Sequence, residues 1–219
     1  PTGLKVNYRV IADCICRGNK VIDEWMVRDQ SAIVKQVGLE PHEFGRQLAL
    51  NLKNAGSTVP SVQDYVKRWE GPPESGPLSG AAKNLAQSYQ ALWEQSEFNA
   101  LEKSHNRACQ IHAPEGKVIY GRDQLIEFLT GYTKSFRKGS YRVHHWIVNE
   151  EEGKNTRIAL RWSFSAEHTG FGSFGEPTGA PVVIMAITHA EMQEDLVVRE
   201  YHAIDEISLW MQISGYSMS

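Results

Sequence analysis

Apolar and polar residues alternate along residues 6–16, with the apolar side chains at the even positions. Such alternation is typical of a strand with one buried face. Gly18-Asn19 is a two-residue turn signal, so residues 20–28 are expected to return as a second strand. With this loop, the register predicts one apolar face. Its members are Tyr8, Val10, Ala12, Trp25, Val27 and Asp29.

A second hairpin of the same kind is expected over residues 182–204, with Glu194-Asp195 as its turn. It repeats the first hairpin at an offset of 176 residues, the distance from Asp29 to Asp205, without a gap between residues 11 and 36. The same pairing logic predicts a shared face for Tyr201, Ala203, Asp205, Ile184, Ala186 and Thr188. A loop longer by one residue would reverse this assignment.

Helical spacing of apolar residues predicts helices over residues 40–53, 62–69 and 81–98, and another after Gly121. Residues 101–111 are expected to continue as a helix. Strands are predicted over residues 141–148 and 157–167, and the Gly- and Pro-rich residues 71–80 indicate a loop. This order predicts an α+β fold with helices on one face of a curved antiparallel sheet. The predicted division is a partial unit over 1–53, a linker over 54–80 and a complete domain over 81–219.

Composition narrows the function. The net charge of −3 lacks the basic excess typical of nucleic-acid binding, and no apolar run approaches the roughly 20 residues that span a bilayer. Three cysteines without a C-x-x-C motif suit a reducing compartment, so a cytoplasmic location is expected. The chain begins at Pro1 inside a strand-like pattern, and we expect the gene product to extend upstream.

Four segments carry a resemblance to a known family. They are His112-Ala113-Pro114 with Gly121, Arg161-Trp162 leading to Glu167-His168-Thr169-Gly170, Pro177-Thr178-Gly179, and Glu200-Tyr201 with Asp205. In this order they resemble the SnoaL-like polyketide cyclases of the nuclear-transport-factor-like (cystatin-like) superfamily. Residues 1–39 resemble only the final hairpin and helix of the same domain, as an incomplete first copy in tandem. Two departures are Tyr201, where the family more usually has Trp, and Gln193-Glu194-Asp195, which replaces a glycine turn.

The resemblance implies a cone-shaped fold around an apolar pocket, with no metal and no cofactor. In the family, an acid at the position of Asp205 serves as general acid and base in an intramolecular aldol cyclisation. Burial on an apolar wall is expected to raise the pKa of such a carboxyl. His168 is the candidate donor to the developing enolate oxygen. The predicted substrate contacts are Trp162, Tyr201, Phe128 and Trp146, and Asp29 is the equivalent acid of the first copy.

Each candidate also has a structural interpretation. Asp205 can cap the helix that follows it, and His168 can bond within its glycine-rich turn. Trp162 and Tyr201 can be core aromatics.

The predicted function is a cofactor-independent cyclase or isomerase acting on a small apolar carbonyl or polyketide-type compound. The alternative is a non-catalytic module of the same fold for ligand binding or assembly. Epoxide hydrolysis would require an Asp-Arg-Asp arrangement that the sequence does not reveal.

The expected partners are a small apolar molecule and a second copy of the chain, and neither a nucleic acid nor a membrane. Two chains are expected to form a homodimer through the outer face of the sheet, because members of this superfamily often do so. The predicted register places His189 and His202 on that outer face.

Overall fold

The computed structural model describes residues 3–71 and 76–218, so residues 72–75 of the predicted linker lie outside the described part. The chain begins with a hairpin and three helices: β1 (Val10–Arg17), β2 (Lys20–Arg28), α1 (Gln30–Gln36), α2 (Pro41–Asn54) and α3 (Val62–Trp69). Helix α3 matches the predicted helix inside the linker segment. Its last residue, Trp69, is buried and donates its indole N–H to the carbonyl of Trp162 at 2.9 Å. This contact holds α3 against the main sheet.

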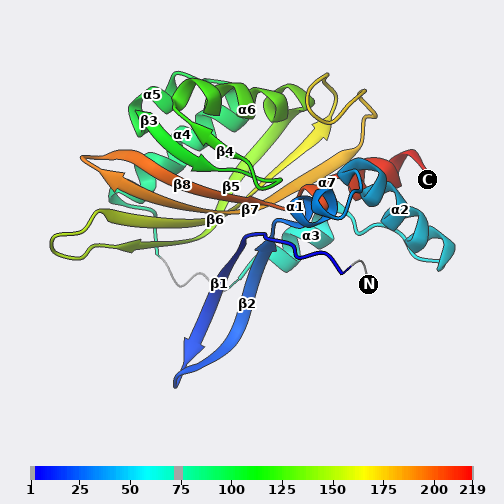
Figure 1. The fold of residues 1–219 in the computed structure, drawn as a ribbon, viewed down its shortest axis with the longest axis horizontal. Coiled ribbons are helices and arrows are strands. Elements are labelled where there is room, and N and C mark those ends of the chain that lie inside the picture. The colour runs from blue at the N-terminus through cyan, green and yellow to red at the C-terminus, as the bar shows by residue number, and fades with distance from the viewer. Residues whose placement is uncertain (1–2, 72–75, 219) are drawn as a thin grey trace.

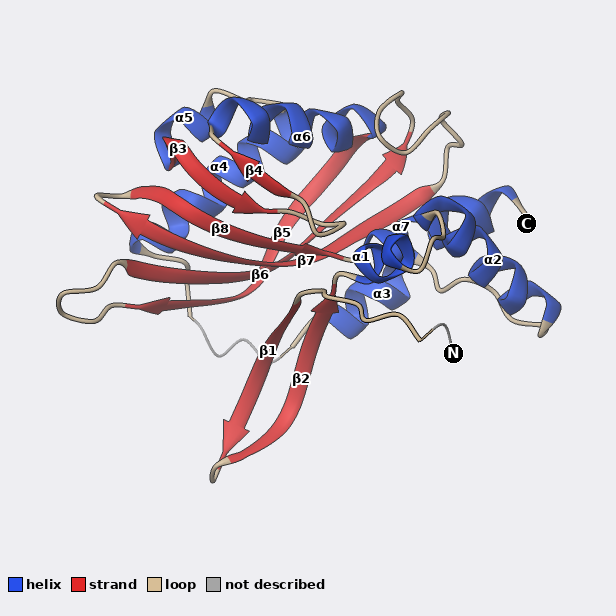
Figure 2. Ribbon diagram, in the orientation of Figure 1, coloured by secondary structure: helices blue, strands red, loops and turns tan. Residues whose placement is uncertain are grey.

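The remaining elements build the main domain. They are α4 (Gly80–Gln95), α5 (Ala100–Ser104), β3 (His105–His112), β4 (Val118–Tyr120), α6 (Arg122–Ser135), β5 (Phe136–Asn149), β6 (Thr156–His168), β7 (Pro181–Gln193), β8 (Leu196–Ile204) and α7 (Glu206–Ser217). The sheet has the order β4-β3-β8-β7-β6-β5. Helices α4 to α6 lie on one face of this curved sheet, and the β1–β2 hairpin projects from the other (Figures 1 and 2). The fold is therefore α+β, as predicted. None of the described helices is long and apolar enough to cross a membrane.

The sheet is mixed, because β3 and β8 run parallel. The predicted all-antiparallel sheet is wrong at this pair, and the predicted helix over residues 101–111 is wrong beyond Ser104. Cys109 and Ile111 are fully buried at a spacing of two residues, which is the spacing of a strand. Their pairing partner lies about 90 residues later in the chain, so local spacing alone could not reveal it.

The two hairpins have the same backbone structure. Both turn residues have positive φ in each, Gly18 and Asn19 in the first and Glu194 and Asp195 in the second. Strand β2 and the start of α1 coincide with β8 and the start of α7 at the offset of 176. Each hairpin also contains one irregularity in pairing, between Ile15 and Cys16 and between Glu191 and Met192, which are equivalent positions.

These irregularities overturn the predicted faces, since a one-residue shift moves every later side chain to the opposite face. Trp25 and Val27 pair with Asp13 and Ile11, and these four side chains are buried. Tyr8, Val10 and Ala12 lie on the exposed face instead.

In the second hairpin, Tyr201 and Ala203 pair with His189 and Ile187 on the outer face of the sheet. His202 pairs with Thr188 and faces the interior, where its ring contacts Tyr89 and Glu200, so its predicted place on the outer face is wrong.

Equivalent residues of the two hairpins meet in one apolar cluster on the outer face of the sheet. Ile11, Trp25 and Val27 pack with their counterparts Ile187, Tyr201 and Ala203. Each hairpin thus contributes the same three positions to the cluster, as the two halves of an interface with a two-fold axis do. A homodimer through the outer face remains a prediction, and this part of that face is already covered within the chain.

A buried ion pair adds to this interface. Arg161 of β6 donates from Nε to Asp13 Oδ2 at 2.7 Å, and its guanidinium lies 4.1 Å from the ring centroid of Trp25. His145 Nδ1 contacts the same carboxylate at 2.8 Å. Because the cation is desolvated against an indole face, this contact contributes more than an exposed pair would.

Candidate active site

Aromatic side chains fill the space between the concave face of the sheet and helices α4 and α6. The ring centroid of the fully buried Trp162 lies 5.4 Å from the ring centroid of Trp93 and 5.3 Å from that of Tyr141. The ring of Trp93 in turn lies 6.0 Å from that of Tyr132. An apolar, aromatic interior with a few polar groups is the usual lining of a small-molecule site.

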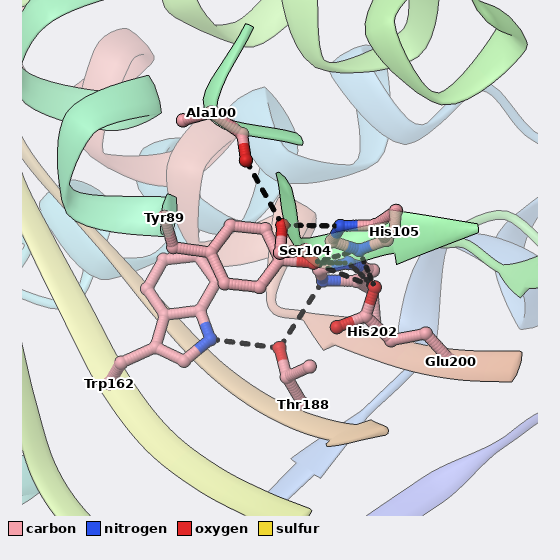
Figure 3. Close-up of polar contacts among 8 residues, drawn as sticks. All are labelled: Tyr89, Ala100, Ser104, His105, Trp162, Thr188, Glu200 and His202. Carbon is pink, nitrogen blue, oxygen red and sulfur yellow. Dashed lines mark hydrogen bonds and ion pairs between the residues drawn. The ribbon is translucent and has the colours of Figure 1, made fainter. Parts of the chain in front are cut away.

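The carboxylate of Glu200 lies at the centre of this interior with no exposed surface. The hydroxyl of Tyr89 donates to its Oε2 at 2.7 Å, and Nε2 of His105 and of His202 lie 3.0 and 3.1 Å from the same oxygen. Figure 3 shows these side chains converging from α4, β3 and β8. The Ser104 hydroxyl lies 2.9 Å from Nδ1 of His105. We call Glu200, Tyr89, His105 and His202 the Glu200 centre.

The tautomer of His202 follows from its neighbours. The Trp162 indole donates to Thr188 Oγ1 at 2.9 Å, and that oxygen lies 3.3 Å from Nδ1 of His202. Nε2 of His202 faces the Glu200 carboxylate, which can only accept, so Nε2 carries a proton. The Thr188 hydroxyl, which accepts from the indole, has its own hydrogen available for Nδ1 of His202. These contacts connect the Glu200 centre to Thr188 of β7 and, through it, to Trp162 of β6.

Electrostatics keep Glu200 ionised. Burial alone would raise the pKa of this carboxyl, but the facing imidazoles of His202 and His105 outweigh burial and hold the pKa well below its usual range. Burial, reinforced by the charge of Glu200, raises the pKa of Tyr89 well above 10. Glu200 is therefore held as an ionised carboxylate with a neutral phenol beside it.

Three polar atoms in this interior make no hydrogen bond within the described part of the chain. They are Glu200 Oε1, the Trp93 indole Nε1 and the Tyr141 hydroxyl. Trp93 and Tyr141 both contact Trp162, and the charge of Glu200, after burial, raises the pKa of Tyr141 well above 10. One acceptor and two donors thus remain unused in the same aromatic interior. An unpartnered buried polar group costs about 1 to 3 kcal/mol, so such a set is typical of a binding site.

A second acid, Glu206, lies at the first position of α7. Its Oε1 accepts a short hydrogen bond from the hydroxyl of Tyr132, and its Oε2 is buried without a partner in the described chain. Burial raises the pKa of Glu206 to about 7, against the opposing effect of the Tyr132 hydrogen bond. Tyr132 packs on Trp93, so Glu206 adjoins the aromatic interior. The environments of Glu200 and Glu206 push their pKa values apart.

The candidate acid Asp205 is the N-cap of α7. Its Oδ1 accepts the backbone N–H of Ser208 at 3.0 Å, and burial raises its pKa. Its charge also raises the pKa of Tyr65 on α3, after the larger effect of burial. Asp205 thus lies toward the outer face, and the structure does not bring it into contact with His168 or the Glu200 centre.

Asp29, the equivalent acid, caps α1 in the same way through Ala32 N–H at 3.0 Å. It also accepts the backbone N–H groups of Glu115 and Gly116, at 3.0 and 2.9 Å. Asp29 therefore attaches the first hairpin unit to the loop after β3.

The other predicted residues are scattered. His168 is buried against Phe136, with Nδ1 3.1 Å from the Thr178 hydroxyl, and burial lowers its pKa. Trp162 lines the interior as predicted, and Phe128 packs on Tyr132 at 5.2 Å. One predicted contact lies elsewhere: Tyr201 stacks on His112 on the outer face, with ring centroids 4.4 Å apart. Trp146 is partly buried and packs against the interior cluster that contains Trp162.

Sequence reasoning missed the two buried acids. Glu200 carried two signals, its match to Glu24 at the offset of 176 and its place in one of the four segments of the resemblance, but its partners His105 and Tyr89 are 95 and 111 residues away. Glu206 adjoins Asp205, the residue to which the resemblance assigned the acid role.

Among the described residues, no group of three or more His, Cys, Asp and Glu side chains is placed to hold a metal ion.

The fold and the buried acids define a class of α+β cone proteins with an enclosed polar centre. The family model for SnoaL-like polyketide cyclases matches residues 83–213, and the chain belongs to this family. A comparison with curated proteins returns no match.

Solved structures share the fold. A proposed SnoaL-like polyketide cyclase from Shewanella putrefaciens is 17% identical, with a TM-score of 0.52 over 67% of this chain and 91% of that one. A proposed polyketide cyclase from Acidithiobacillus ferrooxidans is 13% identical, with a TM-score of 0.52 over 63% and 96%. TsrD from Streptomyces laurentii is 13% identical, with a TM-score of 0.50 over 63% and 98%.

Proposed function

We propose that this chain catalyses a cyclase- or isomerase-type reaction on a small, mostly apolar carbonyl compound inside the cone, by acid–base chemistry that needs no cofactor. Glu206 is the residue that moves the proton. The observation that carries the proposal is the buried Glu206–Tyr132 pair, in which one carboxyl oxygen is bonded and the other is unused.

The protonation of Glu206 suits this role. Proton transfer is most efficient when the pKa of the acid or base lies near the working pH, and the pKa of Glu206 is raised to about 7. The pKa of Glu200 is instead held low by two imidazoles, which makes it a weak base. When two acids have environments that differ in this way, the one near neutrality is the better candidate for proton transfer.

The proposed steps use the unused polar atoms of the interior. Glu206 Oε2 takes a proton from the carbon next to a carbonyl, and the electron pair moves onto the carbonyl oxygen as an enolate. The Trp93 indole and the Tyr141 hydroxyl are donors suited to that oxygen. In a cyclisation, the enolate carbon adds to a second carbonyl of the same molecule, and Glu206 returns the proton to the new alkoxide.

The test compares two neighbouring acids. Aromatic polyketide esters are offered to the purified protein, and turnover is measured for wild type, Glu206→Gln and Asp205→Asn. Loss of the proton-transfer group is expected to lower kcat at least about 100-fold in Glu206→Gln, roughly 2.7 kcal/mol in activation free energy. Asp205→Asn is the matched control and keeps wild-type kcat within a few-fold, because an amide oxygen can still cap α7.

Equal kcat in wild type and Glu206→Gln, with loss in Asp205→Asn, would return the catalytic role to Asp205. Saturable binding without turnover in the wild type would favour the alternative, a ligand-binding module. The unpartnered acceptor and donors of the interior are the observation that favours this second candidate.

A further inference from the structure

The exposed face of the first hairpin has a buried counterpart within the same chain. Val10 and Met26 are 42% and 43% exposed, whereas the equivalent Ala186 and His202 of the second hairpin are 0% and 4% exposed. Near the tip of the hairpin, Val21 and Ile22 are 59% and 52% exposed. Apolar side chains left exposed on one face of a hairpin are typical of an interaction site.

The edges of the first hairpin also differ from those of its counterpart. Strand β7 pairs with β6 and β8 pairs with β3, so both outer edges of the second hairpin are used. Among residues 3–71 and 76–218, β1 and β2 pair only with each other. Open edges present a row of backbone donors and acceptors that another strand can pair with.

We propose that the exposed face and the open edges of β1–β2 are a docking surface for a polypeptide that supplies the helices and remaining strands of a second cone. The proposal rests on the repeated hairpin. The unit β7–β8–α7 has the same turn, the same pairing irregularity and the same helix cap as β1–β2–α1, and the structure shows what packs on it. What covers β7–β8 is the scaffold of α4 to α6 and β3 to β6. The inference does not rest on the proposed function.

The equivalence of the two hairpins predicts individual contacts of the docked scaffold. Glu24 occupies the position of Glu200 and would meet a tyrosine and a histidine of the scaffold, as Glu200 meets Tyr89 and His105. Asp205 would receive the loop after the first strand of the second cone, as Asp29 receives Glu115 and Gly116.

A second copy of this chain does not fit as the occupant. Its own β7 and β8 already occupy the edges of β6 and β3, and its helices α4 and α6 already cover their sheet. The occupant is therefore a scaffold of this fold for which β1–β2 serves as the last hairpin.

The probe is a polypeptide made of residues 80–180 of this chain, which carries α4 to α6 and β3 to β6 without β7 and β8. It is co-expressed with the tagged, full 219-residue chain, and the complex is measured by light scattering after size exclusion. Labelling of the exposed Cys14, on the same face as Met26, reports coverage of the hairpin. We expect a one-to-one complex in which Cys14 is labelled at least tenfold more slowly.

Three variants locate the contact. Met26→Asp should abolish the complex and Glu24→Gln should weaken it several-fold. Asp23→Asn should leave it unchanged, because Asp23 is a neighbouring carboxylate on the opposite face of β2. The proposal is overturned if the full chain does not retain the fragment, or if Met26→Asp retains it equally. Slow Cys14 labelling in a dimer of the chain alone would also overturn it, in favour of self-association.

Discussion

The two hairpin units, β1–β2–α1 and β7–β8–α7, have the same local structure and very different surroundings. Both contain a positive-φ turn, a one-residue pairing shift at equivalent positions and an aspartate that caps the helix. Yet the inward face of the second unit holds the Glu200 centre, whereas the equivalent face of the first is exposed. Chemistry in this fold is therefore a property of what packs on the hairpin, and the hairpin alone does not supply it.

Glu24 and Glu200 make this point at single-residue level. Both precede the aromatic residue of their strand, but only Glu200 meets imidazoles and a phenol. The same carboxylate is solvated in one unit and is the centre of a buried network in the other.

The largest expected difference is between Glu200→Ala and Glu24→Ala. Removing Glu200 leaves His105 and His202 buried without their shared partner, which is expected to cost about 3 to 5 kcal/mol in the free energy of unfolding. Glu24→Ala should stay within about 0.5 kcal/mol, as for most surface positions. Urea denaturation of both variants measures the difference. Similar losses in the two variants would mean that the Glu200 centre contributes nothing special to stability.

The second expected difference is in pH dependence. The carboxyl of Glu206 keeps its proton up to a pKa of about 7 in the folded chain, whereas in the unfolded chain it titrates near about 4.3. Between these values the folded state binds more protons, so stability falls as pH rises from about 4.3 to about 7 and is level above that. Over this range the free energy of unfolding falls by roughly 4 kcal/mol.

Glu206→Gln cannot titrate and should lose this slope, and Gln30 is the uncharged residue at the equivalent place in the first unit. Free energies of unfolding at several pH values compare wild type and variant. Parallel pH profiles would show that Glu206 titrates normally in the folded chain.

The smallest expected difference separates the two caps. Asp29→Ala removes a cap and leaves the N–H groups of Glu115 and Gly116 without their acceptor, which is expected to cost about 2 kcal/mol. Asp205→Ala removes only the described cap bond to Ser208 and should cost about 1 kcal/mol. Thermal unfolding of the pair gives the ranking, and a larger loss in Asp205→Ala would contradict it.

Local patterns predicted where the helices and strands lie better than which side chains of each strand are buried. The alternation of residues 6–16 and the turns at Gly18-Asn19 and Glu194-Asp195 gave both hairpins correctly. The pairing shift near each turn reversed the faces, because residue period alone cannot detect an extra residue in one strand. The placement of Tyr201 and His202 was wrong for this reason.

The candidate site was less accessible from the sequence than the fold. The partners of Glu200 come from α4, β3 and β8, and nothing in their local sequence indicates that they meet. The strong helix-cap preference of aspartate accounts for the position of Asp205 at the N-terminus of α7. The raised pKa of Glu206 depends on burial beside Tyr132, 74 residues earlier, which only the folded chain creates.

The most direct test of the central claim is the protonation of Glu206 itself. Infrared difference spectra of wild type and Glu206→Gln, recorded across pH, detect the carbonyl band of a protonated carboxyl group. We predict a band in the wild type that disappears with a midpoint near pH 7 and is absent from Glu206→Gln. A wild-type spectrum that matches that of Glu206→Gln from about pH 5.5 upward would contradict the account, because an ordinary glutamate has lost its proton by then.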